Sequence, residues 1–170
     1  MEIWDLYNLN REKIGTHVRG TELPEDGYHL VVHVWLKDRA GRYLMTQRAA
    51  NKPTFPLFWE CVGGSVLQGE SSINAAVRET EEEVGVRLQP EHGKLLFTKV
   101  RGTVDEKRYN DIVDVWCFEY DGEVNVAQNA TTDEVTQVKW MYKDEIAHLR
   151  EKGNLIYSIK DLDYFFKEMD

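Results

Sequence analysis

The chain has few cysteines, no long apolar run and a deficit of positive charge, and each absence excludes a class of protein. Its two cysteines are too few for a disulfide framework, so a reducing, cytoplasmic setting is expected. No apolar run approaches the roughly 18 residues of a membrane span, and no charged-then-apolar leader follows Met1. The net charge of −9 argues against a surface for nucleic-acid polymers. We therefore expect neither a membrane protein nor a nucleic-acid-binding protein.

The length of 170 residues suits one domain with a sizeable core. No repeat, low-complexity tract or linker divides the chain, so we expect a single domain over residues 1–170. Within residues 1–27, two short strand-like segments at 2–9 and 14–19 flank a polar turn and predict an N-terminal β-hairpin. Composition leaves the oligomeric state open, a homodimer included.

Alternating apolar and polar residues, separated by turn residues, predict a mixed α/β domain. Further strands are expected at 29–36, 42–48, 58–62, 94–101, 111–120 and 135–142, and helices at 143–152 and 159–169. In the strand at 29–36, Leu30 and Val32 share one face with every second residue after them, and His29 and His33 share the other.

A further helix is predicted between Ser71 or Ser72, which suit its N-cap, and Gly85, which suits a left-handed residue after its last turn. Its apolar residues recur at helical spacing on one stripe. This stripe comprises Ile73, Ala76, Val77, Thr80 and Val84.

Three carboxylates form a second stripe on the same helix. Glu79, Glu82 and Glu83 are spaced i, i+3 and i+4, and like charges at that spacing destabilise a bare helix by roughly 0.2–0.5 kcal/mol per pair. A divalent cation with hard oxygen ligands, Mg²⁺ or Mn²⁺, would relieve this repulsion. A glycine in the preceding loop can bring a backbone carbonyl to such a metal without a side-chain clash. The alternative is a solvated acidic face.

The order glycine, five residues, glutamate, seven residues, then Arg-Glu-apolar-any-Glu-Glu-any-Gly-apolar resembles the Nudix box. The matching residues are Gly64, Glu70, Arg78, Glu79, Glu82, Glu83, Gly85 and Val86. Thr80 is the one departure, since the family usually has an aliphatic residue there, and it affects helix packing more than chemistry. The resemblance covers roughly residues 28–150.

This resemblance implies a single Nudix hydrolase domain: an α/β/α sandwich with a mixed sheet, here preceded by the hairpin. It implies metal-dependent hydrolysis of a diphosphate linkage in a nucleoside diphosphate derivative or similar small molecule. The implied ligands of Mg²⁺ or Mn²⁺ are the carbonyl of Gly64 and the carboxylates of Glu79, Glu82 and Glu83. Arg78 and Glu70 would hold the glutamates and the loop in place.

Substrate contacts and the general base are less defined. The basic groups that could meet phosphate are Arg48, Lys52, Arg101, Lys107 and Arg108. Of these we select Arg48, together with His29, whose strand face could look toward the box. The general base is expected to be a box glutamate or an acidic residue of a later segment. The later candidates are Asp105, Glu106, Asp111 and Asp114.

Two alternatives to the hydrolase stay open. The first is an isomerase, because parts of the chain resemble the Nudix branch that includes isopentenyl diphosphate isomerase. Those parts are 4–7, 28–34, Arg48, 55–56 and Trp59. That isomerase needs a cysteine and a histidine where this chain has Gly63 and Ser65. Cys61 precedes the cysteine position, Gly63, by two residues, which is about 7 Å along a strand. Cys61 is therefore interpreted as structural. The second alternative is a catalytically silent, ligand-binding Nudix module.

Overall fold

The computed structural model describes residues 1–104, 106–156 and 161–169. Its strands are β1 (Ile3–Tyr7), β2 (Lys13–Val18), β3 (His29–Lys37), β4 (Tyr43–Arg48), β5 (Trp59–Glu60), β6 (Val62–Ser65), β7 (Lys94–Val104), β8 (Lys107–Glu119) and β9 (Val135–Met141). Its helices are α1 (Ser72–Val84), α2 (Val126–Asn129), α3 (Lys143–Glu151) and α4 (Leu162–Met169), with a 3₁₀ turn η1 (Pro90–His92). None of the helices described is long and apolar enough to cross a membrane.

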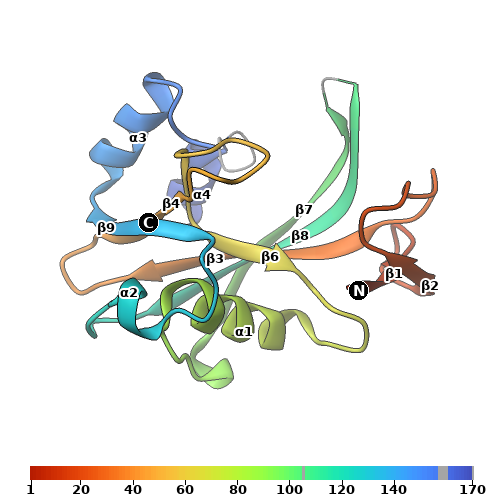
Figure 1. The fold of residues 1–170 in the computed structure, drawn as a ribbon, viewed down its shortest axis with the longest axis horizontal. Helices are drawn as coiled ribbons and strands as arrows, with labels where there is room; N and C mark the ends of the chain where they lie inside the picture. Colours follow the sequence, from red (N-terminus) through yellow and green to blue (C-terminus); the bar gives the residue numbers. More distant parts are fainter. Residues whose placement is uncertain (105, 157–160, 170) are drawn as a thin grey trace.

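A mixed sheet forms the centre of the molecule, as the sequence predicts. Within the described residues it has seven strands in the order β5-β4-β3-β8-β7, with β6 also pairing with β3 and β9 with β4. Only the β3–β8 pairing among these is parallel, from His29 opposite Asp111 to Lys37 opposite Glu119. Helices α1 and α2 lie on one face of the sheet, and α3 and α4 lie on the other (Figure 1).

The two faces of β3 feed two hydrophobic clusters, which confirms the predicted alternation. Leu30 and Val32 belong to the cluster packed beneath α1, and Trp35 belongs to the cluster packed beneath α4. There Trp35 stacks on Phe165, with ring centroids 4.0 Å apart. Because apolar burial is the main favourable term in folding, β3 joins the two layers into one core.

Helix α1 has the ends that the sequence predicts. The Ser71 side chain accepts a hydrogen bond from the Asn74 amide, and Gly85 ends the helix with φ of 72°. Thr80 is fully buried, and its Oγ1 donates to the Ala76 carbonyl at 2.7 Å. The hydroxyl is therefore satisfied inside the helix, which explains how a threonine replaces the usual aliphatic residue.

Two expectations differ from the structure in detail. The single strand expected at 58–62 is two strands with different partners, because β5 pairs with β4 and β6 pairs with β3. The strands expected at 94–101 and 111–120 extend toward each other as the β7–β8 arm, a long curved hairpin (Figure 1). The start of the helix expected at 159–169 lies partly outside the described residues.

Near its tip, polar and cation–π contacts add to the backbone ladder of the β7–β8 arm, and apolar alternation does not predict such contacts. Arg101 donates to both carboxylate oxygens of Asp111, at 2.7 and 2.6 Å. The Tyr109 ring lies between two cations, 5.2 Å from the Arg101 guanidinium and 4.8 Å from the Lys107 amine.

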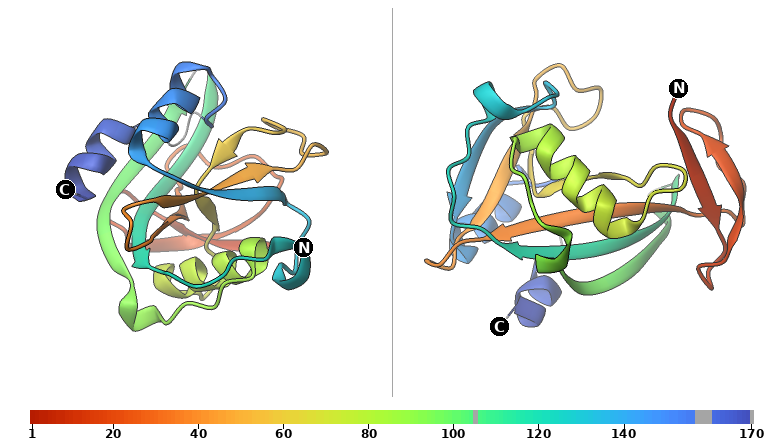
Figure 2. Two further views of the ribbon diagram at one scale, coloured as in Figure 1. Left: turned by 90° about the vertical axis from the view of Figure 1, so that its left-hand side faces the viewer. Right: turned by 90° about the horizontal axis from the view of Figure 1, so that it is seen from below.

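The predicted N-terminal hairpin is present as β1 and β2, and it stands across one end of the main sheet (Figure 2). Tyr7 and Tyr28 exchange two backbone hydrogen bonds, at 2.8 and 2.9 Å. Arg11, in the turn, donates to both carboxylate oxygens of Asp114 on β8, at 2.8 and 2.5 Å. The hairpin is thus fixed to the main sheet at two places.

Candidate active site

A cleft of about 750 Å³ lies between α1, the β4–β5 region, the start of β9 and the N-terminal hairpin. Its floor is formed by β3 and β6. Most of its lining is polar or charged. The charged residues that line it are Glu2, Arg19, Arg48, Lys52, Glu60, Arg78, Glu79, Glu82, Glu83 and Glu134. The cleft therefore combines a concentration of carboxylates with several cationic groups.

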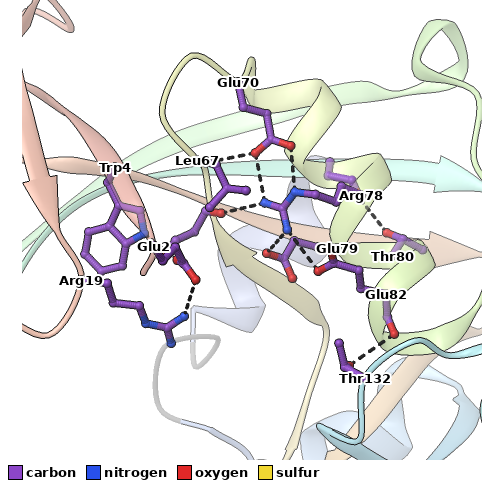
Figure 3. Close-up of polar contacts among 12 residues, drawn as sticks. Glu2, Trp4, Arg19, Leu67, Glu70, Arg78, Glu79, Thr80, Glu82 and Thr132 are labelled. Carbon is purple, nitrogen blue, oxygen red and sulfur yellow. Dashed lines mark hydrogen bonds and ion pairs between the residues drawn. The ribbon is translucent and has the colours of Figure 1, made fainter.

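Arg78 lies at the centre of the box residues (Figure 3). Its Nε and Nη2 donate to the two oxygens of Glu70, at 2.8 and 3.0 Å. Its Nη1 donates to Glu79 at 2.9 Å and to Glu82 at 3.1 Å, and Nη2 also donates to the Ser65 carbonyl at 3.0 Å. Burial opposes the charge, but the hydrogen bonds and charges of Glu70 and Glu79 raise the pKa of Arg78. The structure thus brings together the arginine and the glutamates of the box.

The carboxylates on α1 are crowded. Glu83 is only 7% exposed, and burial raises its pKa well above the ordinary value, with the charges of Glu60, Glu79 and Glu134 adding to the effect. Burial also raises the pKa of Glu79 to about 7, although Arg78 opposes the shift. Both carboxyls therefore lack enough cationic and hydrogen-bonding partners in the protein to offset their burial.

Gly64 on β6 lies against this cluster. A Cβ at this position would lie 2.2–2.6 Å from the carboxylate atoms of Glu79, so no other residue fits without a shift. Carboxylates and a backbone carbonyl are hard oxygen donors, and the uncompensated charge favours a divalent cation. Among the described residues, no three acidic, histidine or cysteine side chains are already arranged around one point as metal ligands. The donor types therefore fit Mg²⁺ or Mn²⁺, while Glu79 and Glu82 are engaged by Arg78.

Cationic groups line the opposite side. Arg48, one of the two predicted substrate contacts, lines the cleft and pairs with Glu60 at 3.0 Å. Lys52 lines it as well and pairs with Glu134 at 2.5 Å. Of the other basic candidates, Arg101 is bound to Asp111 on the β7–β8 arm instead.

The expectation that His29 lines the substrate pocket is not supported. His29 is buried and stacks on Trp4 of β1, with ring centroids 4.0 Å apart, and burial lowers its pKa to about 4. His33 lines the cleft in its place. The alternation of β3 identified the correct face but could not show that the hairpin covers one end of it.

The proposed later-segment bases lie elsewhere. Asp111 is held by Arg101, and Asp114 is held by Arg11 and by the Thr98 hydroxyl. Glu106 lies at the tip of the β7–β8 arm, and Asp105 lies outside the described residues.

Sequence reasoning missed two carboxylates that do line the cleft, Glu60 and Glu134. Glu134 reaches it because the preceding loop is fastened to α1: the amides of Thr131 and Thr132 donate to the Glu82 carbonyl at 2.9 and 3.2 Å. The available signal was the position of Glu134 directly before a predicted strand, but its use required the order of strands in the sheet.

Sequence reasoning also missed the hairpin's contribution. Glu2 and Arg19 line the cleft and form an ion pair at 3.0 Å (Figure 3). The Arg19 side chain is 61% exposed, more than Arg48, Lys52 or Arg78.

Cys61 lies at the floor of the cleft but is almost fully buried. It is 2% exposed, and burial raises the pKa of its thiol well above the ordinary value. A buried, protonated thiol is a poor nucleophile at neutral pH, in agreement with a structural role.

Comparison with known proteins agrees with the geometry of the cleft. The NUDIX domain family model matches residues 27–161. An uncharacterised Nudix hydrolase of Listeria monocytogenes is 34% identical over 158 residues, which span 92% of this chain and 89% of the relative. An isopentenyl-diphosphate Δ-isomerase of Mycolicibacterium vanbaalenii is 31% identical over 125 residues, which span 67% of this chain and 64% of that enzyme.

A crystal structure of a Deinococcus radiodurans protein has the same fold. It superimposes with a TM-score of 0.71 at 21% identity and covers 91% of each chain. The box residues meet at one cleft, the family model matches most of the chain, and similarity to a Nudix hydrolase extends over nearly its full length. The protein therefore belongs to the Nudix hydrolase family.

Proposed function

We propose that this cleft hydrolyses a diphosphate linkage in a nucleoside diphosphate derivative or similar small molecule, with Mg²⁺ or Mn²⁺ as cofactor. One observation carries the proposal: the box glutamates on α1 and cationic groups on the opposite wall line one cleft. A diphosphate has to be neutralised before water can approach its phosphorus, and both sets of groups suit that task.

The residues that would hold the cation are Gly64, Glu79, Glu82 and Glu83. When bound, a divalent cation neutralises phosphate oxygens and acidifies a water molecule. Arg78 and Glu70 orient the carboxylates through the contacts described above.

Other residues of the cleft bind the substrate and move the proton. Arg48, with Lys52 beside it, binds phosphate oxygens through charge-assisted hydrogen bonds. Water forms a bond to one phosphorus while the bridging P–O bond breaks, and a cleft carboxylate accepts the proton of the water. Glu134 lies outside the box and lines the cleft, which makes it the later-segment candidate in place of Asp111 and Asp114.

We further propose that residues 1–170 act as one Nudix hydrolase domain, with residues 1–27 as its hairpin extension. Two observations support this proposal: the hairpin is fixed to the main sheet, and it contributes lining residues to the cleft.

A panel of diphosphates tests the proposed function. Nucleoside diphosphate derivatives, nucleotide sugars and non-nucleotide diphosphates are incubated with the protein and Mg²⁺ or Mn²⁺, and the products are identified by ³¹P NMR. Glu82→Gln should lower turnover of the best substrate by at least ~100-fold, because it removes a charge proposed to hold the cation. Its circular dichroism spectrum and Tm should show an intact fold. Near-normal turnover in the folded variant contradicts the proposal.

The isomerase-like activity is a second candidate because isopentenyl-diphosphate isomerases are among the relatives. The residues argue against it, since Gly63 and Ser65 occupy the positions of its catalytic cysteine and histidine and Cys61 is buried. An assay with isopentenyl diphosphate and Mg²⁺ tests this candidate. If the double bond does not move, the isomerase activity is excluded. Hydrolysis of any member of the diphosphate panel excludes a catalytically silent module.

A further inference from the structure

The N-terminal hairpin lies outside the stretch matched by the family model, yet it contacts the loop that leads into α1. This loop, residues 66–71, is here called the box loop. The Ile3 carbonyl accepts a hydrogen bond from the Gln68 amide at 2.9 Å. Two residues along β1, the Asp5 carboxylate accepts one from the Gly69 amide at 2.8 Å. Strand β1 therefore binds the box loop at two successive amides.

Asp5 is unusually placed for a charged residue. It is 6% exposed, and its carboxylate lies between the Gly69 amide and the Lys13 amine, which is 2.7 Å from Oδ1. Gly69 has φ of +75°, a backbone conformation that residues other than glycine rarely adopt. It belongs to a turn that is closed by a hydrogen bond from the Glu70 amide to the Leu67 carbonyl. The Gly69 amide is directed out of this turn, so its partner comes from β1.

A short series of contacts leads from Asp5 to the box glutamates. Gly69 is followed directly by Glu70, whose side chain also accepts from the Leu67 amide at 3.0 Å. Glu70 in turn holds Arg78 by two hydrogen bonds, and Arg78 holds Glu79 and Glu82 (Figure 3). The position of the box loop therefore sets where the Arg78 guanidinium lies, and with it two carboxylates proposed to bind the cation.

The hairpin is itself firmly anchored, which a positioning role requires. Trp4 stacks on His29 of β3 with an interplanar angle of 8°, and Arg11 is bound to Asp114 of β8. Asp5 thus connects the box loop to the central strands of the sheet. Catalytic groups must be held to within about 0.5 Å, and supporting hydrogen bonds provide that accuracy.

We propose that Asp5 is a positioning residue for the hydrolysis: it fixes the box loop through the Gly69 amide, and so holds Glu70 and Arg78 in register with the glutamates of α1. The N-terminal hairpin then contributes one positioning residue, Asp5, to the catalytic site. The effect on turnover rests on the proposed function, whereas the effect on the box loop does not.

Three variants separate this role from general stability. Asp5→Ala removes the acceptor and should lower kcat by about 10- to 100-fold, with KM changed less than about 3-fold. Asp5→Asn retains an oxygen acceptor for the Gly69 amide and should recover kcat to within about 3-fold of the original protein. Lys13→Gln removes the ion pair alone and should also leave kcat within about 3-fold.

A matched control is Leu6→Ala, which truncates a buried neighbour on the same strand that has no hydrogen bond to the box loop. It should lower Tm as much as Asp5→Ala does, without the loss of kcat. Suppose that the two variants lower Tm by the same amount and also lower kcat by the same factor. In that case Asp5 contributes only to stability, and the proposal fails.

Hydrogen exchange provides a readout that needs no substrate. In Asp5→Ala, peptides covering residues 66–71 should exchange at least about 10-fold faster, while peptides from β3 and β8 stay unchanged. Unchanged exchange in the box loop overturns the proposal. If the original protein hydrolyses no diphosphate, the proposed function fails, and the exchange result still decides whether Asp5 holds the loop.

Discussion

At the scale of single residues, the approach of Gly64 to Glu79 shows how little space the cleft leaves beside its carboxylates. A side chain at position 64 would meet the carboxylate group of Glu79, which could make room only by leaving its present position. A charged group displaced by 1 Å loses much of its catalytic value, so this glycine is required by contact and not only by its backbone freedom.

Gly64→Ala should therefore lower kcat by about 100-fold, because the added methyl group displaces the Glu79 carboxylate. Tm should change by only a few degrees, since β6 keeps its pairing with β3. Steady-state kinetics and thermal unfolding measure the two effects.

Gly102→Ala provides the control, since nothing lies within 4 Å of the Cβ it would add. It should leave kcat unchanged. Equal activity of the two alanine variants would refute the steric argument at position 64.

At the scale of elements, helix α1 was predictable almost residue by residue, and the cleft around it was not. The caps, the buried stripe and the carboxylate stripe of α1 depend on spacings of three or four residues, which a sequence displays directly. Glu60, Glu134 and Arg19 reach the same cleft only because of how distant strands pair and where the hairpin packs. Local periodicity carries no information about such partners, and it cannot show that His33 rather than His29 lines the cleft.

The contribution of the hairpin to stability can be tested through the ion pair between Arg11 and Asp114 of β8. Burial opposes the charge of Asp114, yet hydrogen bonds from Arg11, Ser72 and Thr98 keep the pKa of its carboxyl below the ordinary value of 3.8. A lowered folded-state pKa stabilises the protein above the unfolded value, and this contribution is lost as the pH falls through the folded value. The pair should therefore matter at pH 7 and lose its effect progressively as the pH falls below the ordinary value of 3.8.

Arg11→Gln leaves the buried Asp114 carboxylate without its cation and should cost about 1–3 kcal/mol of unfolding free energy at pH 7. Urea unfolding at several pH values measures the difference between variant and original protein. The difference should shrink as the pH falls below 3.8. A difference that is constant from pH 7 to pH 3 would show that the charge of Asp114 is not involved.

At the scale of the whole molecule, acidic residues outnumber basic ones, and the same excess occurs among the residues that line the cleft. The net charge is −9, and three glutamates contact Arg78 while the buried Glu83 lines the same cleft. A ligand that binds only the folded state stabilises it by RT ln(1 + [L]/Kd). A cation held by the cleft should therefore raise the stability of the whole domain.

Mg²⁺ at about ten times its Kd should add about 1.4 kcal/mol and raise Tm by about 3–6 °C. EDTA should reverse the effect, and sodium chloride of equal ionic strength should not reproduce it. Glu83→Gln should abolish most of the rise, because Glu83 is the most deeply buried of the proposed ligands. A rise of the same size in Glu83→Gln would place the stabilising cation elsewhere.

The parallel pairing of β3 with β8 also has a consequence for biosynthesis. Its first register pair joins residues 29 and 111, so the centre of the sheet cannot close until the ribosome has released most of β8. The β1–β2 hairpin, whose partners lie close together in the chain, can form long before that. During translation the hairpin is therefore made well before Asp114 of β8, to which Arg11 binds, and the cleft is completed only after Glu134 has been made.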